Sequence, residues 1–407
     1  MIWITGKIHT SFADYLERNN IPYGLIVDTR VRSLPESATQ VVKLDLDNNS
    51  LLSQQLSQLP IPDVSAVMVA GYENYIVPAA YITQTYGIPG LTVTAAQAAT
   101  DKTLMRQAFQ NYDPTITPNF AEVANWSAVE SFMNSHQFPV MLKPASLMKS
   151  LLVSKSSDWE ALRQNFTALA DGIQQAYDQQ AVSQNPKMLI EEFLEGSMHT
   201  VAGFVDAVGE AVLLPQIADC VRASDIGVDD SYLYSRHLPS GLSPTNHDAV
   251  LRVAAKGIKA LGLTSCPVHI EVILTATGPK LIEIGARNGG YRPLMYAAAY
   301  GIDMYEAVLD TAFGRPTRLT SNKAAQVIVL ELFPAIEGLF KELRNEAVIT
   351  KLPTVSKLTV RAHPDSLVGT ARRGFKASVI IILISDNADQ IAADYAIIRE
   401  TGLVVVS

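Results

Sequence analysis

The stretch LIEIGARNGG, residues 281–290, begins as a buried strand and then places charges where a core strand carries apolar side chains. Side chains in a strand alternate between its two faces, so Glu283 points away from the faces of Ile282 and Ile284. Glu283 must therefore face surroundings that accept a negative charge. What lies opposite Glu283 decides both the fold and the chemistry of this segment.

The strand VHIEVIL, residues 268–274, supplies a partner for Glu283. If Thr277 centres the turn between the two strands, antiparallel pairing places Glu271 directly opposite Glu283. Two carboxylates would then share one face with Cβ atoms about 5 Å apart, which is destabilising unless a cation compensates them. Mg²⁺ prefers oxygen ligands of this kind, usually one or two carboxylates together with substrate phosphates. The alternative is a register shifted by one residue, with one glutamate held in a salt bridge.

Arg287 follows Glu283 by four residues and stands beside the segment NGG, where the backbone can approach a ligand closely. A planar guanidinium at this position suits a phosphoryl or acyl-phosphate oxygen. The alternative is a structural salt bridge between Arg287 and one of the two glutamates.

Two lysines extend the pattern of charges. Lys102 stands at the predicted first turn of the helix KTLMRQAF, where the helix dipole disfavours a cation unless a phosphate is bound there. Lys143 ends the apolar strand PVML just before Pro144, so we expect its ammonium group at the rim of a sheet. The alternative for both lysines is an ordinary solvated surface charge.

Length, composition and charge indicate a globular protein of several domains. A chain of 407 residues suggests two or three domains at about 150 residues each. The net charge of −8 argues against binding to nucleic-acid phosphates, so nucleic acid is not an expected partner. No apolar run reaches the roughly 18 residues of a membrane span, and we expect a cytoplasmic protein with no membrane partner. Cys220 and Cys266 lack metal-ligand spacing and are predicted to be ordinary thiols.

Strand-like and helix-like segments alternate through residues 1–100, which predicts a parallel sheet with crossover helices. This unit lacks the G-x-G-x-x-G pattern, so a dinucleotide site is not predicted. Residues 219–246 are polar, and we expect a long loop that borders a site. From about residue 316 the pattern is mixed again, which predicts a smaller α+β unit.

Five segments, taken in order, resemble the ATP-grasp superfamily: DKTLMRQAF, FPVMLKPA, LIEEFLEGSMHTV, HIEVIL and KLIEIGARNGG. The resemblance extends from about residue 60 to 315 and is closest to L-amino-acid ligases that form dipeptides. It implies an α/β fold with a Rossmann-like parallel unit at residues 1–100. An ATP-grasp module at 101–315 would contain two α+β subdomains with a mobile lid near 117–190. A small α+β unit would follow at 316–407.

The resemblance assigns nucleotide contacts by position. Lys102 and Lys143 match the two lysines that contact the ATP phosphates and the adenine side. His199 falls where biotin-carboxylase-like members place a histidine that contacts ribose. The hinge strand that reads adenine matches Glu191, Glu192, Phe193 and Leu194.

The resemblance also assigns metal and substrate contacts. Glu271 and Glu283 match the metal-binding glutamates, and Arg287 matches the arginine that stabilises the acyl-phosphate state. Ser150 and His237 fall near lid and substrate-loop positions that amino-acid ligases use.

The sequence departs from the family in two places. The lid turn, usually rich in glycine, reads ASLMKSLLV, so Lys149 or Ser150 is expected to replace backbone contacts to the phosphates. Gly285 stands where many members have an asparagine, a feature shared by several amino-acid ligases.

These features predict an ATP-dependent carboxylate–amine ligase that forms an amide, such as a dipeptide, through an acyl-phosphate with release of ADP and phosphate. ATP and Mg²⁺ are the expected cofactors, with Mn²⁺ as an alternative metal. The expected partners are small-molecule carboxylate and amine substrates, namely amino acids, and a homodimer is compatible with the sequence. Two alternatives are a nucleotide-binding sensor or scaffold without ligase activity, and a ligase of the purine-pathway or carboxylase type.

Overall fold

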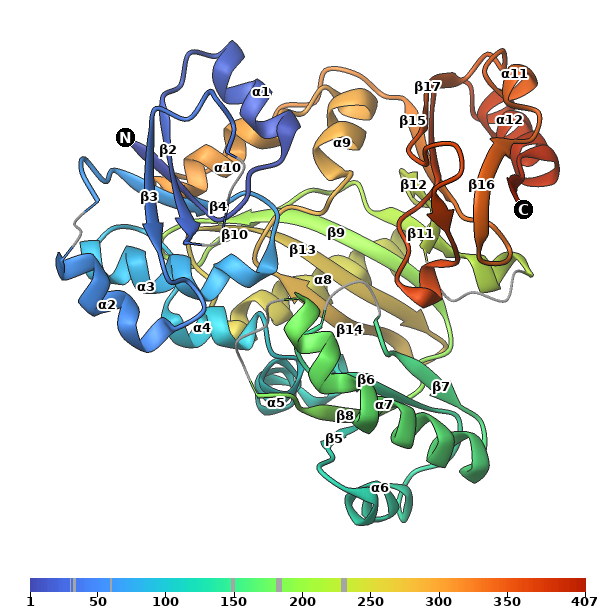
Figure 1. Ribbon diagram of the computed structural model, residues 1–407, viewed down its shortest axis with the longest axis horizontal. Coiled ribbons are helices and arrows are strands. Elements are labelled where there is room, and N and C mark those ends of the chain that lie inside the picture. The colour runs from blue at the N-terminus through green and yellow to red at the C-terminus, as the bar shows by residue number, and fades with distance from the viewer. Residues whose placement is uncertain (30, 32–33, 59–60, 148–150, 181–184, 228–232) are drawn as a thin grey trace.

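The computed structural model describes residues 1–407 except 30, 32–33, 59–60, 148–150, 181–184 and 228–232. The described strands form four sheets, of which the largest runs through the middle of the molecule (Figure 1). None of the described helices combines the length and the apolar character that crossing a membrane requires.

The N-terminal sheet is parallel throughout, with strand order β3-β2-β1-β4. Its elements are β1 (Ile2–Thr5), β2 (Tyr23–Asp28), β3 (Gln40–Leu44), β4 (Ala66–Val69), α1 (Thr10–Arg18), α2 (Asn49–Gln58) and α3 (Ile76–Tyr86). Helix α1 packs on one face, and α2 and α3 pack on the other. Runs such as IWIT and YGLIVD are buried along their whole length because both faces of the sheet are covered. The predicted Rossmann-like parallel unit is therefore confirmed.

A small antiparallel sheet follows, with strand order β5-β8-β6-β7. Its elements are β5 (Phe120–Glu122), β6 (Val140–Pro144), β7 (Ser154–Ser156), β8 (Met188–Glu192), α6 (Trp126–Met133) and α7 (Trp159–Gln180). Leucine and aromatic side chains of α6 and α7 pack on one face of this sheet. We call this unit the lid sheet, and in Figure 1 it lies below the central sheet. Helices α4 (Val93–Ala98) and α5 (Lys102–Tyr112) connect it to the N-terminal unit.

The central sheet is antiparallel and contains residues 281–285 of the stretch LIEIGARNGG. Its strands, in pairing order, are β14 (Gly278–Gly285), β13 (Cys266–Thr275), β9 (Ser197–Val205), β11 (Ala218–Arg222), β12 (Leu233–Leu238), β15 (Gln326–Leu332), β19 (Val379–Ser385) and β17 (Val355–Val360), with β10 (Ala211–Leu213) beside β9. Helices α8 (Pro244–Leu261) and α12 (Ala388–Thr401) cover one face. Helix α9 (Arg292–Tyr300) packs on the opposite face, as do α10 (Met304–Ala312) and part of the N-terminal unit.

One expectation about this region needs correction. The segment 219–246, predicted to be one long loop, contains part of β11 and the whole of β12. Both strands are short and rich in polar residues, and they form because they pair with their neighbours across the sheet. Strands β15, β19 and β17 continue the central sheet beyond β12, and the domain boundary near residue 316 stays a prediction.

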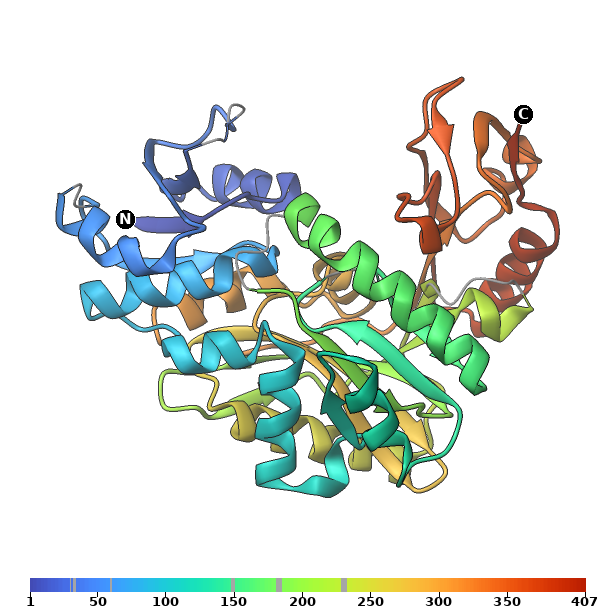
Figure 2. The same ribbon diagram turned by 60° about the horizontal axis from the view of Figure 1, so that its bottom comes forward.

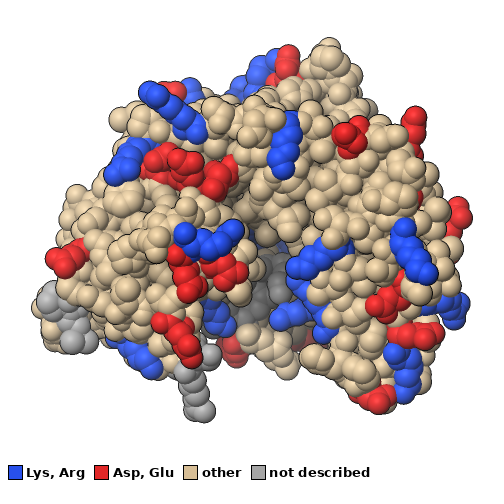
Figure 3. All heavy atoms as spheres, turned by 90° about the horizontal axis from the view of Figure 1, so that it is seen from above, with Lys and Arg blue, Asp and Glu red and all other residues tan. Residues whose placement is uncertain are grey.

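The remaining C-terminal elements form a small unit beside the end of the central sheet. They are β16 (Gly338–Leu343), α11 (Glu346–Ile349), β18 (Leu367–Val368) and β20 (Val404–Val406). In Figure 2, α7 of the lid sheet runs diagonally across the front of the molecule. Seen from above, the surface is hollowed near its centre, and lysine and arginine side chains gather around the hollow (Figure 3).

Candidate active site

The site begins with two facing glutamates on adjacent strands. Glu271 of β13 pairs directly with Glu283 of β14, as the sequence predicts. One step further, Val272 pairs with Leu281, so Ile282 forms a bulge without a partner residue on β13. The two carboxylates therefore share one face of the central sheet, which we call the site face.

Each glutamate has a cationic or polar neighbour but is not sealed from solvent. Lys102 Nζ lies 3.1 Å from Glu283 Oε1, and His269 Nε2 lies 3.6 Å from Glu271 Oε1. The side chains of Glu283 and Glu271 are 24% and 23% exposed. A ligand can therefore reach both carboxylates.

The environment drives the pKa values of the two carboxyls apart. Burial raises the pKa of Glu283, and the carboxylates of Glu73 and Glu271 raise it further against the opposing effect of Lys102. Burial also acts to raise the pKa of Glu271, but the His269 imidazole and the charges of Arg287 and Lys102 outweigh burial and lower that pKa. The charge on Glu283 is therefore unfavourable in the protein as it stands.

Lys102 occupies the first position of α5, as predicted. Asp101 caps this helix by accepting hydrogen bonds from the backbone N–H groups of Thr103 and Leu104. Lys102 Nζ also donates to the carbonyl oxygen of Leu147 at 3.2 Å. Burial opposes the charge on Lys102, but Glu283 and other carboxylates outweigh burial and raise the pKa of this lysine. Lys102 therefore stays a cation beside the glutamate pair.

Arg287 forms an ion pair with Glu73 instead of with either predicted metal glutamate. Glu73 belongs to the short helix η1 (Glu73–Tyr75), which follows β4 of the N-terminal sheet. Burial opposes the charge on Arg287, but Glu73 and Glu283 outweigh burial and raise the pKa of this arginine. A Cβ atom at Gly285 would lie 3.1 Å from Glu73 Oε1, so a glycine there leaves room for the carboxylate.

Glu73 is not among the residues predicted from the sequence. A signal existed, because ligands of open parallel sheets bind beyond the carboxyl ends of the strands, and Glu73 follows the end of β4.

Lys143 is not placed as predicted. Lys143 is buried instead of emerging at the rim of the sheet, and its Nζ lies 2.7 Å from Glu191 Oε2. Arg106 Nε lies 2.7 Å from Glu191 Oε1, so both carboxylate oxygens have cationic partners. Glu191 is therefore a buried counter-ion, and adenine recognition by the backbone of its strand stays a prediction.

Arg106 was also missed, although it stands one helical turn after Lys102 on α5. Its guanidinium joins the lid sheet to the glutamate strand, because Nη2 also donates to the carbonyl oxygen of Ile282 at 2.8 Å. Ile282 is the bulged residue next to Glu283. Arg106 thus connects Glu191 of the lid sheet to the strand that carries Glu283.

The rest of the predicted hinge lies at the carboxyl end of β8, where Glu192 is the last residue of the strand and Phe193 and Leu194 follow it. The Glu192 carboxylate accepts hydrogen bonds from the backbone and side chain of Asn119. Lys155 Nζ lies 3.8 Å from the ring centre of Phe193, and Leu194 is buried. Adenine recognition by Glu192, Phe193 and Leu194 stays a prediction.

The two predicted histidines do not lie on the site face. Thr200 of β9 pairs with Glu271, so the alternation of side chains turns His199 to the opposite face. His199 pairs across β11 with Asp219, which in turn pairs with His237, so His237 shares that opposite face.

Both histidine rings have protein partners on that face. The two ring nitrogens of His199 are hydrogen-bonded to Asp219 and Ser197. The His237 ring lies 4.8 Å from the Tyr395 ring and is hydrogen-bonded to Ser235. In this arrangement neither histidine joins the glutamate pair, and we leave both out of the proposed site.

Lys149 and Ser150, predicted in the lid turn, lie outside the described residues. Cys220 and Cys266 are buried free thiols, as predicted.

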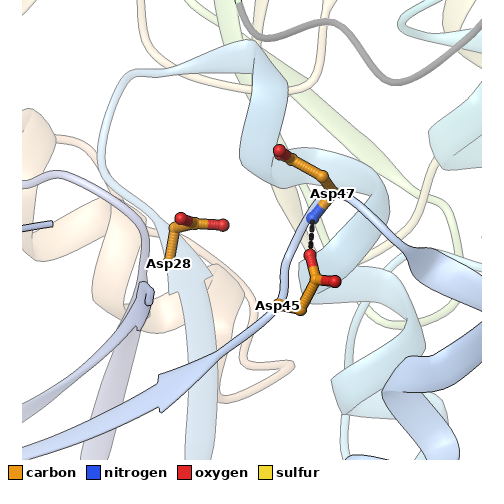
Figure 4. A group of neighbouring side chains, drawn as sticks. All are labelled: Asp28, Asp45 and Asp47. Atoms are coloured by element: carbon orange, nitrogen blue, oxygen red, sulfur yellow. Dashed lines mark hydrogen bonds between the residues drawn. The ribbon is translucent and has the colours of Figure 1, made fainter. Parts of the chain in front are cut away.

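A second acidic cluster lies at the carboxyl ends of β2 and β3 (Figure 4). Carboxylate oxygens of Asp28, Asp45 and Asp47 lie within 4.8 Å of one another. Asp45 Oδ1 accepts a hydrogen bond from the backbone N–H of Asp47 at 3.2 Å, as expected for an aspartate that shapes a turn. This cluster belongs to the N-terminal sheet, whereas the glutamate pair belongs to the central sheet. None of the interactions given above joins the cluster to Lys102 or Arg287.

Comparison with known proteins agrees with this geometry. The family model of the ATP-grasp domain matches residues 136–292, which include strands β6, β7 and β8 of the lid sheet and the residues Glu271, Glu283 and Arg287. The chain therefore contains an ATP-grasp domain and has the ATP-grasp fold.

Three known proteins illustrate the similarity of this chain to ligases. The structure of an L-amino acid ligase from Bacillus licheniformis superimposes with a TM-score of 0.82, covering 100% of this chain and 98% of that one at 16% identity. Alanine–anticapsin ligase from Bacillus subtilis (strain 168) is 26% identical over 274 residues, which are 64% of this chain and 58% of that protein. Phosphoribosylamine–glycine ligase from Methanosphaera stadtmanae is 24% identical over 258 residues, which are 60% of this chain and 58% of that protein. The chain spans about three fifths of the length of the first curated relatives it matches.

The buried Lys143 generates a prediction about pH. Burial lowers its pKa to about 8, with Arg106 and Lys102 acting in the same direction and Glu191 opposing them. Lys143 is therefore charged below about pH 8 and neutral above it. If Lys143 contacts ATP, as the resemblance implies, the dissociation constant of Mg-ATP should rise as the pH passes about 8.

Titration calorimetry on both sides of this pH measures the effect, and Lys143→Arg is the matched control. An arginine remains protonated throughout this range, so the variant should lose the pH dependence whatever its absolute affinity. An equal loss of affinity in both proteins would contradict the assignment.

Proposed function

We propose that this chain is an ATP-dependent ligase that joins a carboxylate to an amine, with amino acids as substrates and a dipeptide or related amide as product. The observation that carries the proposal is the facing pair Glu271 and Glu283 with Lys102 and Arg287 beside it. The L-amino acid ligase whose structure covers nearly the whole chain supports the choice of amino acids. Cytoplasmic location and a homodimer stay predictions from the sequence.

The residues fit a divalent metal. Glu271 and Glu283 provide two hard oxygen donors on one face, and the raised pKa of Glu283 shows that its charge lacks full compensation. Mg²⁺, or Mn²⁺ in its place, would be held by these two carboxylates and would neutralise phosphate charge when bound.

The remaining side chains bind and orient the reactants. Lys102 and Lys143 supply positive charge for the ATP phosphates, and Glu191 with Arg106 fixes the position of Lys143. Arg287 faces charge that develops when a substrate carboxylate attacks the γ-phosphorus, and Glu73 holds its planar fork in place. The acyl-phosphate that forms is then attacked by the amine, which releases phosphate. The lid sheet would exclude water from this intermediate.

A second candidate is a ligase of the purine pathway, favoured by the similarity to phosphoribosylamine–glycine ligases. Both candidates make an amide and release ADP, and they differ in the amine. A sensor without ligase activity would bind ATP and release no ADP on addition of substrates.

The test is a screen of purified protein with ATP, Mg²⁺ and pairs of amino acids, with phosphoribosylamine plus glycine as the purine-pathway arm. We expect equal amounts of ADP, phosphate and an amide whose mass is that of the two substrates minus one water, because the acyl-phosphate route breaks the β–γ bond. Formation of AMP and pyrophosphate would contradict the mechanism. Amide formation only in the purine-pathway arm would favour the second candidate.

Glu283→Gln separates a metal site from a structural salt bridge. Since the fold disfavours the charge on Glu283, the neutral variant should melt at the same or a higher temperature without metal and nucleotide. Wild-type protein should gain about 2.7 kcal/mol from Mg-ATP at 100 times its dissociation constant, and the variant should lose most of this gain together with turnover.

The control is Glu342→Gln, because Glu342 is exposed on β16 and far from the described site. It should change neither the melting temperature nor the response to Mg-ATP. A Glu283→Gln variant that melts lower and still responds normally to Mg-ATP would contradict the metal site and assign Glu283 a purely structural role.

A further inference from the structure

Two arginines enclose the segment NGG, and their surroundings differ. Arg287 lies among carboxylates, which raise its pKa. Arg292, five residues later, is only 2% exposed and begins helix α9. Its guanidinium points back to the central sheet, where Nη2 donates to Thr200 Oγ1 and contacts Cys220 Sγ at 3.9 Å. Nη1 contacts Met295 Sδ at 3.3 Å.

Arg292 has no carboxylate partner within the part of the chain that the structure describes. Burial lowers its pKa, and the groups that favour its charge are the thiol of Cys220 and the hydroxyl of Tyr296. A buried cation without a counter-ion is costly, and proteins usually pair it. A buried cation without a counter-ion beside the candidate active site therefore indicates that an anionic ligand binds there.

Arg292 is next to the glutamate pair. Thr200, which accepts its hydrogen bond, is the cross-strand partner of Glu271, so both side chains lie on the site face. Directly opposed residues have Cβ atoms about 5 Å apart. The Arg292 guanidinium is thus hydrogen-bonded to β9, the strand next to the one that carries Glu271, and it contacts Cys220 of β11 beyond.

Neighbouring groups also lack partners. His269 Nδ1 and Asn288 Oδ1 are buried and have no hydrogen-bond partner in the structure. A Cβ atom at Gly289 would lie 2.7 Å from His269 Nδ1 and 2.8 Å from Arg292 Cγ, so the loop presses its backbone against both side chains. The segment that joins Arg287 to Arg292 therefore borders buried polar atoms that have no protein partner and are available to a ligand.

We propose that Arg292 binds the α-carboxylate of the amine substrate. This inference rests on the ligase function proposed above, and it assigns the second substrate to the class of α-amino acids. In a dipeptide, consecutive Cα atoms are about 3.8 Å apart, so the carboxylate of the attacking amino acid lies within one residue of the acyl carbon. The planar guanidinium is the group best suited to a carboxylate.

The competing explanation is structural, with Arg292 merely fastening α9 to β9 through Thr200. The two explanations predict different stabilities. If Arg292 waits for a substrate anion, Arg292→Met should melt at the same or a higher temperature than wild type without ligands. If Arg292 only fastens α9, the same variant should melt lower and bind substrates normally.

Binding is tested by melting curves with each of the twenty proteinogenic L-amino acids and its carboxamide, in the presence of Mg²⁺ and a non-hydrolysable ATP analogue. At least one amino acid should stabilise wild-type protein more than its carboxamide does, and Arg292→Met should abolish that difference. Arg373→Met is the control, since Arg373 pairs with Glu337 in the C-terminal unit and should behave as wild type. If no amino acid exceeds its carboxamide in wild type, the inference is overturned.

Kinetics with the active pair from the amino-acid screen give the second test. Arg292→Lys keeps the charge and guards against a misfolded methionine variant. Each variant should raise KM for the amine substrate roughly tenfold to a hundredfold, in line with the loss of a hydrogen bond to a charged group, and leave KM for ATP nearly unchanged. The preference of the enzyme for the amine substrate over its carboxamide should fall by the same factor.

An unchanged preference for the acid in both variants would overturn the inference and leave the ligase function standing. Failure of the screen to give any amide would instead remove the proposed function, and the melting curves would still decide whether Arg292 binds a carboxylate.

Discussion

The repulsion between two carboxylates that face each other on adjacent strands is the constraint around which the site is arranged. Glu271 and Glu283 share one face, and the fold brings Lys102 to within 3.1 Å of Glu283 from a helix of another unit. Arg106 on the same helix binds the bulge beside Glu283 and the buried Glu191 of the lid sheet. The helix that carries Lys102 and Arg106 thereby also connects the lid sheet to the central sheet. A phosphate-bearing substrate with a divalent metal would complete this balance of charge.

The N-terminal unit also contributes to the balance of charge at the site. Glu73 reaches the site from the end of β4 and holds Arg287, and Gly285 leaves space for its carboxylate. Carboxylates from two units therefore surround Lys102 and Arg287, whereas Arg292 on the neighbouring helix has none among the described residues. In the function we propose, this uneven distribution of acids separates the place for metal and phosphates from the place for a substrate carboxylate.

The local parts of this arrangement could be predicted from sequence, and the long-range parts could not. Alternation of side chains and a short turn were enough to pair Glu271 with Glu283, although the connection has only Ala276 and Thr277 between the paired Thr275 and Gly278. Ile282 is an extra residue on β14, so the pairing beyond it shifts by one residue. The shifted pairing is the one that a turn centred on Thr277 would give. By contrast, Lys143 was expected at a rim because its partner Glu191 and the second cation Arg106, 85 residues before Glu191, meet only in the folded chain. The strands β11 and β12 were read as a loop for a similar reason, since their polar sequences become strands only by pairing with neighbours.

The central claim is that Glu271 and Glu283 form the metal and nucleotide site. Anomalous diffraction at the manganese edge, from crystals grown with Mn²⁺ and ADP, tests it most directly. We predict a manganese peak between the carboxylates of Glu271 and Glu283, with the ADP phosphates directed toward Lys102. A manganese peak only among Asp28, Asp45 and Asp47, or ADP bound away from the glutamate pair, would contradict this account.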